Sequence, residues 1–148
     1  MLMDEKNYKE KISAFTDHDW QPFIKIIHKI KKSSYFGELG KLEMVEKGVY
    51  QESISTFAPI VSEFLKVVYD LPLIIIFDWR AWKEGWEILN DVNFDFDTLD
   101  IPIKCKLLTA IVRNDRFCEG ALVSAFNSGL ILNILKSMEK ELNSNNVN

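Results

Sequence analysis

The chain has 148 residues, of which 47% are hydrophobic and 27% charged, a composition typical of a globular domain rather than of a disordered or fibrous protein. Its formal net charge of −4 argues against a dedicated nucleic-acid-binding protein, because such proteins neutralise phosphates with a surplus of basic residues. The N-terminal segment carries no apolar run, and the most apolar window, Leu71–Phe77, is too short to span a bilayer. We therefore expect a soluble cytoplasmic protein that binds neither nucleic acid nor a membrane.

Apolar residues at helical spacing predict two helices near the N-terminus. The first is expected over about residues 7–15 and the second over about residues 20–32. Either Asp17 or Asp19 can cap the second helix. Three lysines recur on the polar side of this helix, and we expect them to form a solvated face rather than a contact with nucleic acid or an acidic partner. These lysines are Lys25, Lys29 and Lys32.

The helical pattern breaks after residue 32, where glycines become frequent. Residues 41–53 alternate loosely around the Lys47–Gly48 pair, which is compatible with one short β-hairpin. Helical spacing resumes near Thr56, and Pro72 is expected to end that helix because the residue before a proline disfavours the helical conformation.

The segment FDWRAWKEGWEIL predicts a further helix that starts at Asp78. Asp78 suits the N-cap position, and Phe77 can pack onto Trp82 as a hydrophobic staple. Tryptophans at helical spacing then form one aromatic stripe, which we interpret as core in preference to the wall of a ligand pocket. The stripe consists of Trp79, Trp82, Trp86 and Leu89.

Three helices are predicted in the last third, over about residues 101–112, over about 116–127 and from Leu130 onward, with Asp97 or Asp100 capping the first. Residues 143–148 are expected to form a disordered tail. The predicted fold is therefore mainly α, a single domain of residues 1–148 with about six or seven helices and at most one short hairpin near residues 41–53.

The stretch TAIVRNDRFCEG, residues 109–120, crowds charged residues between two apolar runs. Asp115 would face the apolar side if the helix continued, so we expect the helix to end near Arg113 and Asp115 to cap the next one. Arg113 and Arg116 then flank a tight corner. We favour a structural role, in which an arginine pairs with a buried carboxylate, and Asp78 is one candidate for that carboxylate.

The same corner is also compatible with a ligand site, because arginines beside a helix N-terminus can hold a phosphate or a carboxylate. On this alternative, a pocket lies between the predicted helix start at Asp78–Trp82 and the corner at Arg113–Glu119. The candidate ligand-binding residues are Asp78, Trp82, Arg113, Arg116 and Glu119.

No arrangement of residues predicts catalysis, a cofactor or a metal site. The acidic loop that starts at Asp91 resembles the opening of a calcium loop, but Phe96 and Pro102 occupy the positions that require glycine and glutamate. The two cysteines, Cys105 and Cys118, are interpreted as free thiols. We therefore predict no catalytic residues, no cofactor and no metal.

The segments FDWRAW and TAIVRNDRFCEG resemble a family of small bacterial helical proteins known only as a domain of unknown function. The resemblance extends from about Phe57 to Leu135, and the first third of the chain matches it only loosely. It implies a helical fold and a bacterial cytoplasmic setting, and it implies no activity, cofactor or catalytic residue.

Two hypotheses about function remain open. The favoured one is a non-enzymatic interaction domain with a protein partner, or one that self-associates as a homodimer, because its four tryptophans and ten phenylalanines are plentiful for this length. The alternative is a small-molecule or anion-binding protein, conceivably an enzyme, that uses the pocket at the corner.

Overall fold

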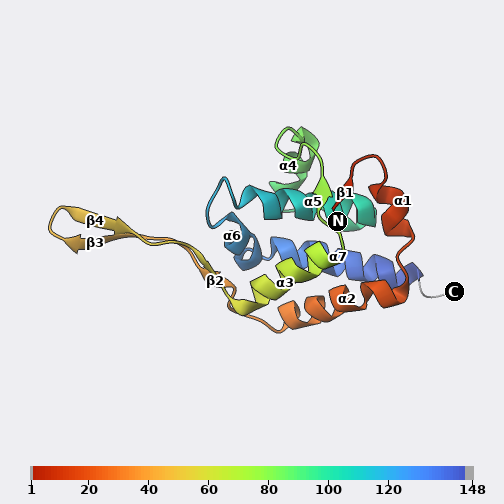
Figure 1. Ribbon diagram of the computed structural model, residues 1–148, viewed down its shortest axis with the longest axis horizontal. Coiled ribbons are helices and arrows are strands. Elements are labelled where there is room, and N and C mark those ends of the chain that lie inside the picture. Colours follow the sequence, from red (N-terminus) through yellow and green to blue (C-terminus); the bar gives the residue numbers. More distant parts are fainter. Residues whose placement is uncertain (1, 146–148) are drawn as a thin grey trace.

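The computed structural model describes residues 2–145, and within them seven α-helices form a body from which a β-hairpin projects (Figure 1). The helices are α1 (Tyr8–Ser13), α2 (Asp17–Lys31), α3 (Pro59–Asp70), α4 (Lys83–Leu89), α5 (Ile101–Asn114), α6 (Ala121–Asn127) and α7 (Leu130–Asn145). A short 3-10 helix, η1 (Phe96–Thr98), precedes α5. The prediction of a mainly α fold with six or seven helices is confirmed.

Six short strands pair two by two. Strand β1 (Met3–Asp4) pairs in parallel with β6 (Ile75–Ile76). Strand β2 (Gly37–Glu38) pairs antiparallel with β5 (Thr56–Phe57), and β3 (Leu42–Glu46) pairs antiparallel with β4 (Val49–Glu52). The hairpin expected near residues 41–53 is therefore confirmed.

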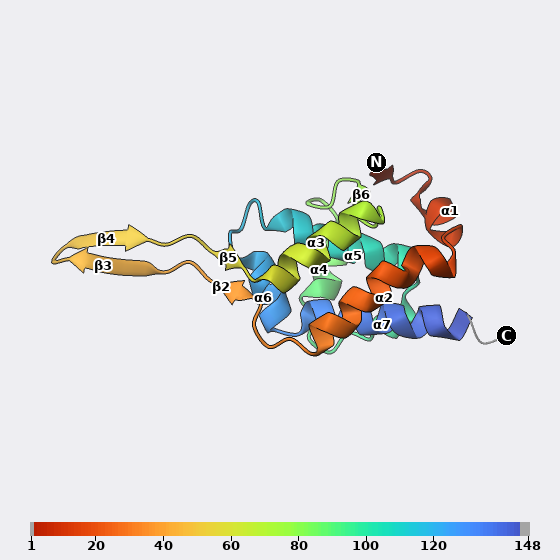
Figure 2. The same ribbon diagram turned by 60° about the horizontal axis from the view of Figure 1, so that its bottom comes forward.

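The core of the body is built around α5, in which all residues from Lys104 to Val112 are buried. Helix α7 contacts both α2 and α5, so it lies between them, while α3 packs beside α2 (Figure 2). The apolar side chains that meet here include Phe23, Phe64, Leu107 and Ile134, each fully shielded from solvent. Burial of this apolar surface is the main driving force for folding.

Of two helix caps predicted from the sequence, one is wrong and the other is confirmed. Helix α2 has Thr16 as its N-cap, and the hydroxyl of Thr16 accepts a hydrogen bond from the backbone N–H of Asp19 at 3.2 Å. Asp19 in turn accepts from the backbone N–H of Thr16, completing a capping box, so the prediction of Asp17 or Asp19 as the cap is wrong. At α5, Asp100 is the cap, as predicted, and accepts from the N–H of Ile103 at 3.0 Å.

The C-terminal helix α7 continues through residue 145, so the first residues of the expected tail are helical, and residues 146–148 lie outside the described part of the chain. No single helix within residues 2–145 is both long and apolar enough to cross a membrane. Helices α6 and α7 reach the required length and composition only as a pair, which is bent by 66° at the junction.

Candidate interaction surface

The hairpin extends away from the helical body in both views, and we call residues 37–57 the arm (Figures 1 and 2). At the base of the arm, backbone N–H groups donate hydrogen bonds to serine hydroxyls. Gly40 donates to Ser55 Oγ at 2.9 Å, and Lys41 donates to Ser53 Oγ at 2.8 Å. Just before the arm, the ring of Phe36 stacks on Phe126 of α6, with centroids 5.0 Å apart. These contacts fix where the arm leaves the body.

The register of the arm brings apolar side chains to one face. Met44 lies opposite Tyr50, and Leu42 lies two residues before Met44, so the three side chains point to the same side of the ribbon. Their exposed fractions are high, at 70% for Leu42, 62% for Met44 and 59% for Tyr50. Every residue of β3 and β4 is exposed. The arm therefore presents an apolar face that the body leaves uncovered.

The arm is also acidic. It carries four glutamates and two lysines, and three of the glutamates lie on β3 and β4. Glu43, Glu46 and Glu52 have no salt-bridge partner among residues 2–145. Because four glutamates outnumber two lysines, the arm has a net negative charge.

The corner at residues 113–120 lies beside the base of the arm. Gly120 has a positive φ of 88°, and a methyl group on it would lie 3.0 Å from Cδ2 of Leu39 and 3.1 Å from Oγ of Ser55. A methyl group on Gly40 would lie 3.5 Å from Oε2 of Glu119. Both views place the loop between α5 and α6 on the side from which the arm leaves (Figures 1 and 2). The corner therefore packs against the base of the arm.

Three expectations about the corner are corrected. Helix α6 begins at Ala121 instead of near Arg116, because Phe117 and Cys118 donate their N–H groups to Asn114 in a turn. The ion pair expected for Arg113 does not occur between described residues. The prediction that Asp115 is the N-cap residue of this helix is wrong, because Gly120 occupies that position, although the Asp115 carboxylate accepts a hydrogen bond from the backbone N–H of Leu122 in the first turn.

An exposed aromatic ring on the corner contacts an arginine from another segment. Phe117 is 61% exposed, and the guanidinium carbon of Arg80 lies 4.4 Å from the centroid of its ring. Trp79 approaches the same ring with centroids 5.8 Å apart. Arg80, Arg113 and Arg116 are all the arginines of the chain, and none forms a salt bridge within the described residues. We call these arginines and Phe117 the arginine corner.

The predicted site residues Asp78 and Trp82 have local partners. Asp78 is exposed, and its Oδ1 accepts from the N–H of Ala81 at 3.3 Å, which closes a turn. Helix α4 therefore starts at Lys83, and the prediction that it starts at Asp78 is wrong. Trp82 is half-buried and meets the edge of Phe77, with centroids 5.5 Å apart, as the expected staple requires.

None of the five predicted ligand-binding residues lines either of two cavities, of about 430 and 450 Å³, that the structure contains. The first cavity opens beside η1 and α7, and its wall includes Phe94, Asp97, Leu130 and Lys140. The second lies between α2 and the end of α7. Within the described residues, no group of three or more metal-ligating side chains comes together.

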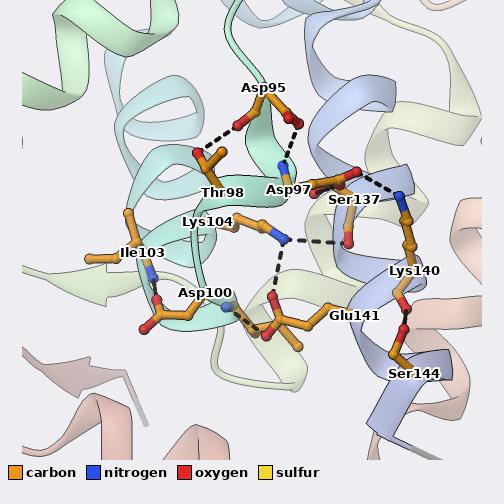
Figure 3. Close-up of polar contacts among 11 residues, drawn as sticks. Asp95, Asp97, Thr98, Asp100, Ile103, Lys104, Ser137, Lys140, Glu141 and Ser144 are labelled. Atoms are coloured by element: carbon orange, nitrogen blue, oxygen red, sulfur yellow. Dashed lines mark hydrogen bonds and ion pairs between the residues drawn. The ribbon is translucent and has the colours of Figure 1, made fainter. Parts of the chain in front are cut away.

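A second polar cluster links α5, α7 and η1 (Figure 3). Lys104 is only 1% exposed, and its Nζ lies 3.1 Å from Oε1 of Glu141 and 3.4 Å from the carbonyl oxygen of Ser137. The other carboxylate oxygen of Glu141 accepts from the N–H of Ile101 at 3.1 Å. A buried lysine needs such partners, because an unpaired charge in the interior is costly. Lys104 and Glu141 each have hydrogen-bond partners, as expected of a cluster that connects α5 to α7.

Asp97 extends this cluster toward solvent. Its Oδ2 lies 2.8 Å from Nζ of Lys140, and its Oδ1 accepts a hydrogen bond from Oγ of Ser137 at 2.6 Å (Figure 3). The hydrogen bond from Lys140, followed by that from Ser137, lowers the pKa of the Asp97 carboxyl below its usual value. Asp97 is thus held ionised at neutral pH.

The sequence indicated the arm only weakly. The alternation of residues 42–46 identified a hairpin, but the same alternation is typical of a strand that buries one face against its own domain. The acidic character of the arm and the nearness of Arg113 to Arg116 could be read from the sequence. The contact between Arg80 and Phe117 could not, because these two residues are far apart along the chain.

Comparison with known proteins places the chain in a family. A model of DUF6508, a family of unknown function, matches residues 15–144 and so includes both the arm and the arginine corner. The match includes the segment from Phe57 to Leu135 and extends beyond it at both ends. No curated protein and no solved structure matches the chain. Because the family model matches most of its length, the chain belongs to the DUF6508 family, a family of unknown function.

Proposed function

We propose that the protein is a self-associating interaction domain and that the arm is its contact surface with a second copy. The observation that carries this proposal is the uncovered apolar face of the arm, formed by Leu42, Met44 and Tyr50. A two-stranded ribbon is marginally stable by itself in water, so an ordered arm gains stability when a partner covers one of its faces.

The choice of a second copy as the partner is supported by the apolar face itself, because the same face on two copies is self-complementary across a two-fold axis. Homodimers with two-fold symmetry are the commonest assemblies of soluble proteins. An arm that contacts the same arm of a second copy across a two-fold axis gives a closed dimer.

The test is a mass measurement on matched variants. We expect wild type to sediment as a dimer at tens of micromolar, and we expect a double variant, Leu42→Ser with Met44→Ser, to sediment as a monomer. Val92→Ser is the control, because Val92 is a 96% exposed apolar residue on the body. It should leave the dimer unchanged.

Two results would contradict the proposal. A wild-type protein that remains monomeric over this concentration range does not self-associate. A double variant that remains dimeric associates through a surface other than the arm. Circular dichroism of each variant checks that the helical body is intact, so that a monomer is not mistaken for an unfolded chain.

We further propose that this assembly forms in the bacterial cytoplasm. Both cysteines are free thiols, and Cys118 is exposed beside the base of the arm. An exposed thiol persists in a reducing compartment. Fractionation of cells that express the protein, with thiol labelling of each fraction, tests the location, and a protein recovered from an oxidising compartment would contradict it.

A further inference from the structure

We infer that the cavity beside η1 and α7 binds a small organic cation, an ammonium compound that also carries an aromatic or other apolar group. The inference does not rest on the proposed function, because no residue of the arm lines this cavity. It assigns a binding site that the sequence did not indicate, since the five predicted ligand-binding residues do not line the cavity either.

The cavity lies between two segments that are distant along the chain. Residues 89–97 form one wall, and one face of α7 with the residue before it forms the other. The bonds from Asp97 to Ser137 and Lys140 hold the two walls together (Figure 3). The volume of about 430 Å³ lies at the small end of the range of ligand pockets, roughly 300–1,000 Å³, so the cavity suits a small molecule.

Aromatic and aliphatic side chains supply the apolar part of the cavity. The rings of Phe94 and Phe96 meet edge to face, with centroids 5.4 Å apart. Leu89 and Leu130 line the same cavity, and they and Phe94 are only partly buried. An apolar group bound here would remove this surface from water, which is favourable. The face of an aromatic ring also attracts a cation.

The charged side chains of the cavity leave one negative charge uncompensated. The lining contains three aspartates and two lysines, which are Asp91, Asp95, Asp97, Lys136 and Lys140. Three carboxylates and two ammonium groups give a net charge of −1. The adjacent pair of Lys104 and Glu141 adds no net charge. A ligand with one positive charge therefore brings the occupied cavity to neutrality.

Ion pairing inside the cavity favours a cation in the same way. Lys140 is already bound to Asp97, with 2.8 Å between Nζ and Oδ2. Asp91, Asp95 and Lys136 have no ion-pair partner among residues 2–145. Two carboxylates and one ammonium group thus remain for a ligand, and an ammonium ligand meets the larger of these two sets.

The two unpaired carboxylates are oriented by local hydrogen bonds and keep a free oxygen. Oδ1 of Asp91 accepts from the backbone N–H of Asn93 at 3.0 Å, and Oδ1 of Asp95 accepts from that of Asp97 at 3.0 Å (Figure 3). Their Oδ2 atoms accept no hydrogen bond within the described chain. Chiefly Asp97, and to a smaller extent Asp95, raise the pKa of Lys140, so the charge of Asp95 acts within this cavity.

Three small probes that vary the charge and the ring separately test the site. 2-Phenylethylamine carries a ring and an ammonium group, which is charged at neutral pH as a lysine side chain is. 3-Phenylpropanoate carries the same ring with a carboxylate, and ethylamine carries the ammonium group without a ring. We expect 2-phenylethylamine to bind at millimolar concentration and to shift the amide NMR signals of residues 89–97 and 130–140. The other two probes should bind about tenfold more weakly or worse.

Removal of the two unpaired carboxylates should weaken this binding. Asp91→Asn with Asp95→Asn removes both charges and keeps the oxygens that accept the local hydrogen bonds. We expect the dissociation constant of 2-phenylethylamine to rise by about tenfold or more in this variant. Glu43→Gln with Glu46→Gln is the control, because it removes two charges from exposed positions on the arm, and it should bind as wild type does. Thermal denaturation checks that both variants are folded.

Four results would overturn the inference. 2-Phenylethylamine that shifts no signals of the cavity residues does not bind there. An equal or higher affinity for 3-phenylpropanoate would assign the cavity to anions, and an equal affinity for ethylamine would mean that the apolar wall takes no part. An equal loss in the arm control would mean that the net charge of the chain governs binding. None of these results affects the proposed self-association, which is tested by mass measurements on variants of the arm.

Discussion

The carboxylate of Asp115 caps helix α6 from seven residues before the N–H group that it binds, because its Oδ1 accepts a hydrogen bond from the backbone of Leu122 at 3.0 Å. The residue at the N-cap position itself, Gly120, has no side chain to do this. This hydrogen bond connects the corner to α6 and stabilises the loop that packs against the base of the arm.

Removal of this cap should destabilise the protein measurably. We expect Asp115→Ala to lower the free energy of unfolding by about 1 kcal/mol, the usual value of an N-cap side chain, and the melting temperature by about 2–4 °C. Asp115→Asn keeps an acceptor oxygen and should lose less. Thermal denaturation of the two variants beside wild type measures the difference, and an alanine variant as stable as wild type would show that the hydrogen bond contributes nothing.

Arg113 should be dispensable for stability. It is half-buried and lacks an ion-pair partner within the described chain, so Arg113→Ala should change the free energy of unfolding by about 0.5 kcal/mol or less. Urea denaturation at a concentration where the protein is monomeric gives this value. A loss of about 3–5 kcal/mol would instead reveal the buried carboxylate partner that the sequence suggested.

Lys104 should behave in the opposite way. Lys104→Ala removes the cation that pairs with Glu141 and leaves the space of a fully buried side chain empty, so it should cost about 3–5 kcal/mol. Lys104→Met fills the same space, and Glu141 retains access to solvent and its bond to Ile101, so this variant should cost less. Equal losses in the two variants would mean that the loss of the charge matters and the loss of packing does not.

Asp97 should contribute stability that depends on pH. Its pKa in the folded protein lies below the ordinary value of 3.8, chiefly because Lys140 binds the carboxylate, so folding favours the ionised form. The contribution is fully present well above pH 3.8 and is lost as the pH falls through the lowered pKa.

The pH dependence can be measured with two variants. We expect the difference in unfolding free energy between wild type and Asp97→Asn to shrink as the solution is acidified from neutral pH. Lys140→Gln removes the cation that lowers the pKa, so it should reduce this pH dependence in the same direction. A difference that stays constant down to the acid transition would contradict a lowered pKa for Asp97.

The sequence alone determined the elements whose signals are local. Helical spacing of apolar residues gave the long helices, a short polar side chain gave the cap at Asp100, and alternation around Gly48 gave the hairpin. These features depend on residues within one or two turns of each other, so composition and order specify them. The same reasoning misplaced the starts of α4 and α6, because turns closed by Asp78 and Asn114 delay both helices.

Only the tertiary structure decided which distant residues meet. It paired Lys104 with Glu141, placed Arg80 over Phe117, and set Gly120 against Leu39 at the base of the arm. It also left the apolar face of the arm uncovered, whereas the alternating pattern fits burial against the body equally well. Contacts between distant segments depend on how the whole chain packs, which the order of residues within one element does not specify.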